Sequence, residues 1–183
     1  MPKSALVILA DGFEEIEAVS CIDILRRAQI QLTIAGLSDI KIRSARNLIV
    51  TADKTLDEIK PEFDACVIPG GGTGAKNIAA SKKVLEIIKE MHSKGKLIAA
   101  ICASPAVVLS PLGILKDKSA TCYPGMQELF NDDVAYEEEA VVCDKNIITS
   151  RGPATSISFA LKIVESLIDK KAAKKIAEDI LYS

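Results

Sequence analysis

The chain has 183 residues, of which 49 % are hydrophobic, so it is long enough for one domain with a sizeable core, and we expect a single domain over residues 1–183. Its net charge of −2 comes without any basic block, which argues against a nucleic-acid partner. No apolar run approaches the roughly 20 residues of a membrane span, and no signal-peptide pattern begins the chain, so we expect a cytoplasmic protein with no membrane partner.

Cysteine usage narrows the chemistry further. The five cysteines are odd in number, widely spaced and without a Cys-x-x-Cys pair. That pattern argues against a disulfide framework, a zinc ribbon and a thioredoxin motif. The single histidine, His92, weakens any zinc proposal, so we expect reduced thiols and no metal site.

Buried strands and helices alternate along the first half of the chain. Apolar runs predict buried strands over residues 4–10, 65–68 and 97–101, and a further strand is expected over residues 32–37. Helical spacing of apolar residues predicts helices over residues 14–28 and 81–93. A polar hairpin is expected over residues 40–51, and a short helical turn over residues 56–59.

The alternation continues in the second half. Short helices are expected over residues 106–109 and up to residue 130, strands over 119–123, 140–143 and 147–150, and longer helices over 155–168 and 171–181. This order predicts an α/β fold, a doubly wound and mostly parallel sheet with helices on both faces. Functional sites in such sheets lie at the carboxyl ends of the strands, where residues 11–17, residues 69–74 and Cys102 all fall.

Cys102 comes directly after the apolar run that ends at Ile101, and a helix is expected to begin soon after it. Ser104 can cap the first turn of that helix, and Pro105 fits its first position. This is the pattern of a nucleophile elbow, and a thiol that faces a helix N-terminus is expected to have a lowered pKa. The alternative is that Cys102 is a small apolar residue that closes a strand.

The glycine run over residues 69–74 fits an oxyanion hole better than a nucleotide site. A Walker A loop needs Lys and then Ser or Thr after its last glycine, but Gly74 is followed by Ala-Lys-Asn. A dinucleotide fingerprint would follow the first strand and have a different glycine spacing. The backbone N–H groups of Gly71 and Ala103 can instead hold a carbonyl oxygen that the Cys102 thiol attacks.

A cysteine hydrolase needs a base, and the sequence does not place a histidine for this role. His92 lies near the end of the helix expected over residues 81–93, away from the carboxyl edge of the sheet. A carboxylic acid must then handle the proton, and Glu14, Glu15 and Glu17 are the nearest candidates by topology. The residues alone leave these three open, because acidic side chains are also ordinary partners for a helix N-terminus.

Several stretches together resemble the ThiJ/PfpI superfamily and, within it, the parkinsonism-associated DJ-1 branch. They are residues 5–17, 26–28, 69–71, 97–105 and 149–153, in order and over nearly the full length. The resemblance implies a flavodoxin-like sandwich that forms homodimers, with Cys102 as a reactive, oxidation-prone nucleophile. It also implies that Glu17 is the carboxylic acid that hydrogen-bonds Cys102, and that Gly71 and Ala103 supply the oxyanion donors.

The resemblance implies further residues of the pocket. Gly70 lies in the matched glycine stretch, and Arg27 and Arg46 match arginines near the pocket and the dimer contact. Tyr123 stands where the family often carries a histidine; it can donate a hydrogen bond but cannot act as a base near neutral pH. Related proteases carry histidine directly after the cysteine, so Ala103 at that position argues against peptidase or amidotransferase chemistry.

From the resemblance we expect a cofactor-independent glyoxalase or deglycase that acts through the Cys102 thiolate. Its substrates would be methylglyoxal and related 2-oxoaldehydes, or the early glycated adducts that these form with proteins, and its product a 2-hydroxy acid. The alternative is an oxidative-stress redox sensor or chaperone-like protein that uses the same cysteine. A catalytically silent binding module would follow if Cys102 were inert to alkylation.

Overall fold

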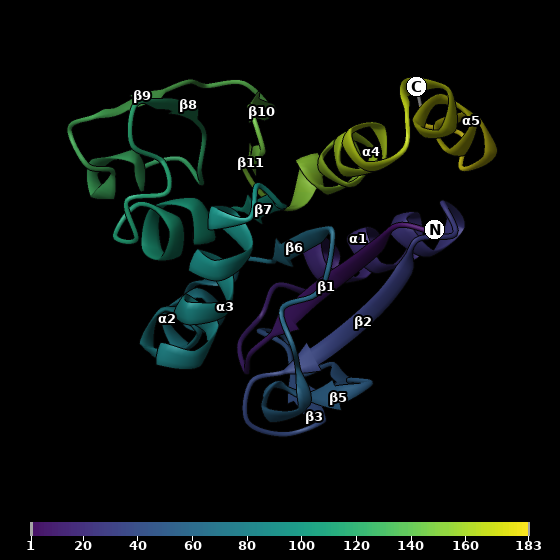
Figure 1. The fold of residues 1–183 in the computed structure, drawn as a ribbon, viewed down its shortest axis with the longest axis horizontal. Helices are drawn as coiled ribbons and strands as arrows, with labels where there is room; N and C mark the ends of the chain where they lie inside the picture. The colour runs from purple at the N-terminus through teal and green to yellow at the C-terminus, as the bar shows by residue number, and fades with distance from the viewer. Residues whose placement is uncertain (1, 183) are drawn as a thin grey trace.

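The computed structural model describes residues 2–182, and a seven-stranded sheet with the order β10-β11-β7-β6-β1-β2-β5 forms its centre (Figure 1). In chain order these strands are β1 Ser4–Leu9, β2 Gln31–Gly36, β5 Lys54–Thr55, β6 Ala65–Ile68, β7 Leu97–Ile101, β10 Val141–Asp144 and β11 Ile147–Ser150. Neighbouring strands run parallel, apart from the antiparallel hairpin of β10 and β11 at one edge. The mostly parallel α/β sheet predicted from the sequence is confirmed.

Helices cover both faces of this sheet. They are α1 Glu15–Arg27, α2 Gly72–Ala80, α3 Lys82–Ser93, α4 Ser156–Leu167 and α5 Lys170–Asp179. On one face α1 packs against α4 and α4 against α5, while α2 and α3 lie together on the other (Figure 1). Within residues 2–182, no helix is long and apolar enough to cross a membrane.

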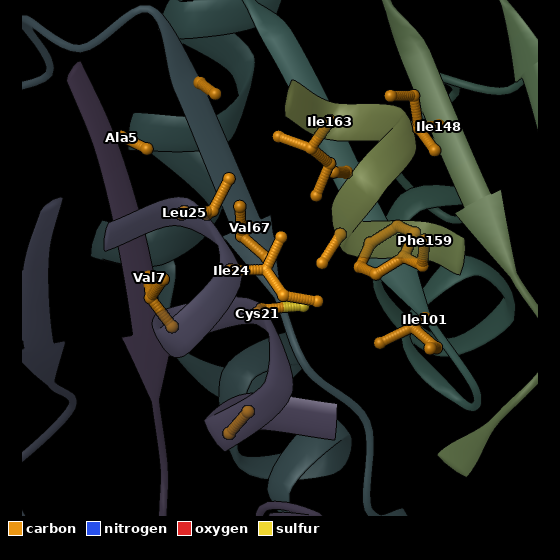
Figure 2. Packing of buried hydrophobic residues seen from close by; sticks show 14 of the residues in the cluster. Ala5, Val7, Cys21, Ile24, Leu25, Val67, Ile101, Ile148, Phe159 and Ile163 are labelled. Atoms are coloured by element: carbon orange, nitrogen blue, oxygen red, sulfur yellow. The ribbon is translucent and has the colours of Figure 1, made fainter. Parts of the chain in front are cut away.

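The central strands are apolar at successive positions because both of their faces are buried. In β1, Val7 belongs to the core under α1 and α4, whereas the next residue, Ile8, belongs to the core under α2 and α3. Figure 2 shows the first of these cores, where Ile24 of α1 and Phe159 of α4 lie close to each other above the strands. Burial of such a side chain contributes about 1.5–3 kcal/mol, so the continuous apolar runs are also the main source of stability.

Local residues set the start of α3, whereas packing sets the start of α2. α3 begins after Ser81, whose hydroxyl accepts a hydrogen bond from the Val84 N–H at 3.4 Å. α2 begins within the glycine run, at Gly72, where no helix is predicted from the sequence. Glycine disfavours helices, so the pattern carried no helical signal there; packing of α2 against Pro105–Leu109 overrides that preference.

Two smaller strand pairs complete the fold. The hairpin predicted over residues 40–51 is confirmed as antiparallel β3 Lys41–Arg43 and β4 Ile49–Thr51. A second pair, β8 Lys118–Ala120 and β9 Val134–Tyr136, runs parallel. β5 and β9 were not predicted, because strands of two and three residues are too short to show a period of apolar side chains. Short 3₁₀ turns lie at Leu56–Glu58, Gln127–Leu129 and Pro153–Thr155.

The carboxyl ends of three adjacent strands meet at one edge of the sheet. β1, β6 and β7 are neighbours, and they continue into residues 10–14, residues 69–71 and Cys102. The chain passes from β1 to β2 on one side, whereas β6 lies on the other side of β1, so the strand order reverses here. Open α/β sheets form their sites at such a reversal, and the stretches predicted to share an edge do share it.

Candidate active site

Cys102 occupies a strained backbone position at the end of β7. Its φ is +64°, a left-handed conformation that costs a non-glycine residue about 1–3 kcal/mol. Two backbone hydrogen bonds hold it there: the Cys102 N–H donates to the Ser150 carbonyl at 2.9 Å, and the Tyr123 N–H donates to the Cys102 carbonyl at 2.8 Å. The structure thus places the thiol on a sharp turn directly after a strand, where the sequence predicts it.

The segment after Cys102 differs from the expectation in one respect. Residues Pro105–Leu109 form a single π-helical turn, in which the Ser110 N–H donates to the Pro105 carbonyl at 3.0 Å. Ser104 does not cap this turn; its buried hydroxyl donates instead to the Pro69 carbonyl at 2.6 Å. The predicted Ser104 cap is therefore wrong, because this hydroxyl joins the chain after β7 to the chain after β6.

Glu17 is the carboxyl group that meets the cysteine. Its side chain comes from the first turn of α1, is fully buried, and accepts a hydrogen bond from the Gly70 N–H at 2.7 Å through Oε2. The Cys102 thiol interacts with the same carboxyl. Its other oxygen, Oε1, has no hydrogen-bond partner among residues 2–182. A buried, half-satisfied carboxyl beside a thiol is suited to holding and passing a proton.

The three glutamates that the residues left open have separate positions. Glu14 precedes α1, and its Oε2 accepts a hydrogen bond from the Glu17 N–H at 2.9 Å as the helix cap. Glu15 faces the β3–β4 hairpin, where its Oε1 accepts a hydrogen bond from the Arg46 N–H at 3.0 Å. Of the three, Glu17 is the one that interacts with Cys102, which is the position that the family resemblance implies.

The pKa of Glu17 lies well above the ordinary value of a carboxyl group. Burial, the largest cause, raises it to about 7, and the nearby charge of Glu14 acts in the same direction. The Gly70 N–H, the Cys102 thiol and the Arg46 guanidinium lower it. Near neutral pH both protonation states of Glu17 are therefore populated, as a group that gives and takes a proton requires.

The pKa of Cys102 is raised, and the sequence-based expectation of a lowered value is wrong. Burial and the charge of Glu17 raise it to about 12, whereas the N–H groups of Gly71 and Ala103 lower it. The expectation failed because the helix after Cys102 is a single turn and because the nearest charge is an anion. Glu17 and Cys102 form one coupled pair that loses the first of its two protons near pH 7 and keeps the second. The thiolate forms when that remaining proton is on Glu17.

Two backbone N–H groups, those of Gly71 and Ala103, act on the Cys102 sulfur. Gly71 has a φ of +91°, and a side chain there would collide with the Gly12 carbonyl oxygen and the backbone of Glu14. Glycine is thus needed for this N–H to come so close. The structure brings the two expected oxyanion donors together beside the thiol, where charge would develop on the oxygen of a bound carbonyl.

The thiol opens onto a pocket of about 420 Å³. Cys102 is 8 % exposed, whereas Tyr123 is 48 % exposed. The lining residues are Glu14, Ala45, Arg46, Gly71, Gly72, Cys102, Ala103, Tyr123, Met126 and Pro153. Sequence reasoning missed Ala45, Met126 and Pro153, because they come from distant segments and carry no group that a pattern search would select.

Other candidates lie outside this pocket. Arg27 is in the last turn of α1, about 15 Å along the helix from Glu17, and its guanidinium pairs with Asp23 at 2.7 Å. The structure therefore does not bring Arg27 to the pocket of its own chain. His92 lies in the last turn of α3, and Cys122, the cysteine next to Tyr123, is buried and does not line the pocket. Within residues 2–182, no group of three or more His, Cys, Asp or Glu side chains is placed to hold a metal ion.

Comparison with protein-family models matches residues 3–166 to the DJ-1/PfpI family. The chain is similar to Protein DJ-1alpha of Drosophila melanogaster, with 42 % identity over 185 residues that cover 99 % of this chain and 85 % of that protein. It is also similar to the Caenorhabditis elegans protein named glutathione-independent glyoxalase DJR-1.2, with 36 % identity over 167 residues, 90 % of this chain and 89 % of that protein. Among solved structures, oxidized Toxoplasma gondii DJ-1 superimposes with a TM-score of 0.96 and 42 % identity over 99 % of each chain.

We expect Gly70→Ala to disable the Glu17–Cys102 pair. A Cβ at position 70 would lie 2.5 Å from the Cys102 Cβ and 2.7 Å from Glu17 Oε2, so both side chains would have to move. The rate of Cys102 alkylation by iodoacetamide, followed by peptide mass spectrometry, should fall about 10- to 100-fold. Gly72→Ala is the matched control, because nothing lies within 4 Å of its added Cβ. Equal rates in the two variants would contradict the steric argument.

We expect Glu17→Gln to stabilise the fold increasingly as the pH rises. Folding raises the pKa of Glu17 from 4.5 to about 7. The contribution of Glu17 to the free energy of unfolding is therefore complete below pH 4.5 and is lost as the pH rises through about 7. The stability gained by Glu17→Gln over wild type should grow by about 3 kcal/mol between about pH 4 and about pH 8, measured by denaturant unfolding.

Glu15→Gln is the control, because its effect on stability should depend on pH in the opposite direction. Despite partial burial, which raises it, the pKa of Glu15 is held below its usual range by its own backbone N–H, the Ser44 hydroxyl, and the backbone and charge of Arg46. Its stabilising effect is therefore present at neutral pH and lost on acidification, so Glu15→Gln should destabilise more at neutral than at acid pH. A Glu17→Gln effect that is independent of pH would show that the Glu17 carboxyl ionises normally.

Proposed function

Because the chain belongs to the DJ-1/PfpI family, we propose that it is a cofactor-independent glyoxalase and deglycase that acts on methylglyoxal and related 2-oxoaldehydes. The observation that carries this proposal is the buried Glu17 carboxyl, which shares one proton with the Cys102 thiol beside two backbone N–H groups. A pocket of about 420 Å³ suits a small substrate. The relative named as a glutathione-independent glyoxalase, at 36 % identity, supports the same class of reaction.

In the first step the Cys102 thiolate attacks the aldehyde carbon while Glu17 carries the shared proton. The sulfur–carbon bond forms as the carbonyl π electrons move to oxygen, and the N–H groups of Gly71 and Ala103 stabilise the negative charge. Glu17 then donates its proton to that oxygen, which gives a neutral hemithioacetal and leaves Glu17 as a carboxylate.

In the second step the Glu17 carboxylate moves a proton between two carbons of the substrate. It removes the hydrogen of the former aldehyde carbon as a proton, and the electron pair forms an enediolate whose negative charge lies on the oxygen of the neighbouring carbonyl. Glu17 returns the proton to the second carbon, and the hydroxyl proton of the first carbon passes to the oxygen of the second, which gives a 2-hydroxy thioester on Cys102. Water hydrolyses this thioester, so methylglyoxal and water yield lactate and the free thiol without an external oxidant.

A redox sensor or chaperone-like protein is the second candidate, and the unpartnered Oε1 of Glu17 beside Cys102 favours it. Two equivalents of peroxide would oxidise the thiolate, through a sulfenic acid, to a sulfinic acid, whose oxygens the N–H groups of Gly71 and Ala103 could hold. A protonated Glu17 would donate a hydrogen bond to the same group. The similar Toxoplasma gondii structure is that of an oxidized protein, which is in keeping with this chemistry.

We also propose that the chain forms a homodimer through the outer side of α1 and the β3–β4 hairpin. Ile16 and Val19 of α1 are 54 % and 44 % exposed, and Leu48 and Ile49 of the hairpin are 48 % and 52 % exposed. The hairpin is tied to the start of α1 by hydrogen bonds to Glu15. Exposed apolar side chains on two connected elements are typical of a surface that a second protein covers.

We expect purified wild type to consume methylglyoxal and release lactate with no glutathione added, and Cys102→Ala to do neither above background. Glu17→Gln should lower turnover about 10²- to 10⁴-fold, because it retains the shape of Glu17 but cannot move a proton. Cys143→Ala is the control for general thiol loss, since Cys143 is an exposed cysteine of β10.

Turnover in Cys102→Ala would contradict the proposed mechanism. Absence of turnover in wild type would contradict the enzymatic proposal itself. In that case, mild peroxide treatment that adds about 32 Da at Cys102 alone would establish the sensor, because a sulfinic acid carries two added oxygen atoms.

We expect Val19→Glu to convert a dimer into a monomer, because it places a charge on the apolar surface formed by α1 and the hairpin. Size-exclusion chromatography with light scattering measures the mass directly. Ile168→Glu is the matched control, since Ile168 is 43 % exposed but follows α4 at another part of the molecule. A monomeric wild type at micromolar concentration would refute the dimer.

A further inference from the structure

Glu14 is a buried carboxylate that the proposed reaction does not use. It is 6 % exposed and lines the pocket together with Cys102, and burial of a charge is costly unless the charge is paired and hydrogen-bonded. Both of its oxygens have partners: Oε2 accepts a hydrogen bond from the Glu17 N–H at 2.9 Å, and Oε1 lies 3.5 Å from Nη1 of Arg46. Glu14 thus joins the start of α1 to the β3–β4 hairpin.

Three hydrogen bonds link Glu14, Gly70 and Glu17 in a closed ring. The Glu14 N–H donates to the Gly70 carbonyl at 3.0 Å, and the Gly70 N–H donates to Glu17 Oε2 at 2.7 Å. The Glu17 N–H donates to Glu14 Oε2 at 2.9 Å and closes the ring. Glu17 is therefore held both at its backbone N–H and at one oxygen of its carboxyl group. Loss of the Glu14 side chain would open the ring.

Arg46 connects this ring to the solvent. Its side chain is 71 % exposed, and Nη1 lies 3.5 Å from Glu15 Oε2 as well as 3.5 Å from Glu14 Oε1. The Arg46 N–H donates to Glu15 Oε1 at 3.0 Å, so the backbone of the hairpin is held in the same place. The Arg46 guanidinium that balances Glu14 is thus also held by Glu15.

We propose that Glu14 is a positioning residue that fixes the Glu17 carboxyl against Cys102 and sets the balance of charge around the pair through Arg46. This inference deepens the proposed function and rests on it. Glu14 acts through Glu17 and Arg46 and takes no part in bond making. A helix cap alone would need one oxygen of Glu14, whereas here the second oxygen is directed to a charged partner that also influences Glu17.

The charges that face Glu17 support this assignment. Glu14 lies at the start of α1, and its charge raises the pKa of Glu17. The thiol of Cys21 lies within α1, and burial raises its own pKa. The hairpin contributes Arg46, which lowers the pKa of Glu17, and the chain after β7 contributes Cys102. Removal of the Glu14 charge should therefore let the Glu17–Cys102 pair lose its first proton at lower pH, and removal of the Arg46 charge should delay that loss to higher pH.

Alkylation of Cys102 by iodoacetamide tests this without requiring turnover. Its rate in the intact protein, followed by peptide mass spectrometry from about pH 5 to about pH 9, should rise with a midpoint near the Glu17 pKa of about 7. We expect Glu14→Gln to move the midpoint down by about half a pH unit and Arg46→Gln to move it up by a similar amount. In turnover of methylglyoxal, Glu14→Gln should lower kcat about tenfold and leave KM within about twofold.

Asp23→Asn is the matched control. It removes an equal charge from α1, but Asp23 pairs with Arg27 and does not line the pocket, so the midpoint should stay at the wild-type value. Circular dichroism would reveal whether Glu14→Gln folds. If it does not, the upward midpoint shift in Arg46→Gln still tests the proposal, because the Arg46 side chain is mostly exposed and its replacement should not disturb the fold.

The outcomes separate the two proposals. Wild-type midpoints in both Glu14→Gln and Arg46→Gln, or shifts in the same direction, would overturn the role of Glu14 even if wild type turns over methylglyoxal normally. Opposite midpoint shifts in the two variants, together with no methylglyoxal turnover by wild type, would support the positioning role and refute the proposed reaction. An unchanged midpoint in Glu14→Gln beside a shifted one in Arg46→Gln would show that Glu14 is only a helix cap, because glutamine keeps an oxygen that can accept from the Glu17 N–H.

Discussion

A carboxyl group buried against a thiol is the constraint on which the rest of this structure depends. Two anions at the contact of Glu17 and Cys102 would be too costly at such burial, so the pair retains at least one proton near neutral pH. The groups that hydrogen-bond this pair are the backbone N–H groups of Gly70, Gly71 and Ala103, which favour negative charge without carrying a charge of their own. The same contact explains Gly70, because only a residue without a side chain lets the two groups meet.

The fold satisfies this constraint through its topology. α1 starts shortly after β1, so its first turn carries Glu17 over the end of the neighbouring strand β6, and β7 brings Cys102 from the other side. Both faces of the sheet are filled with apolar side chains, and close-packed layers of this kind resist small shifts of one strand against the next. The rigidity of the core is thereby passed on to the relative position of two side chains.

The parts of this arrangement that could be predicted are those with a local signal. β1, β6 and β7 were placed within a residue of their ends, because strands buried on both faces leave continuous apolar runs, and the turn at Cys102 followed from its place after such a run. The errors arose where distant contacts decide. The pKa of Cys102 depends on Glu17, the Ser104 hydroxyl bonds to Pro69, and the choice of Glu17 over Glu14 and Glu15 came from family resemblance, since a helix start makes all three carboxylates unremarkable.

The depth of the thiol limits the form in which a protein adduct could be presented. Cys102 is 8 % exposed beside a pocket of about 420 Å³, which accommodates a small dicarbonyl but not a folded protein surface. A glycated group would have to arrive at the end of a long, unhindered side chain, such as that of lysine or arginine. As a deglycase, the protein would therefore serve unstructured tails and freshly synthesised or denatured chains, and lesions on the rigid parts of a folded partner would escape repair.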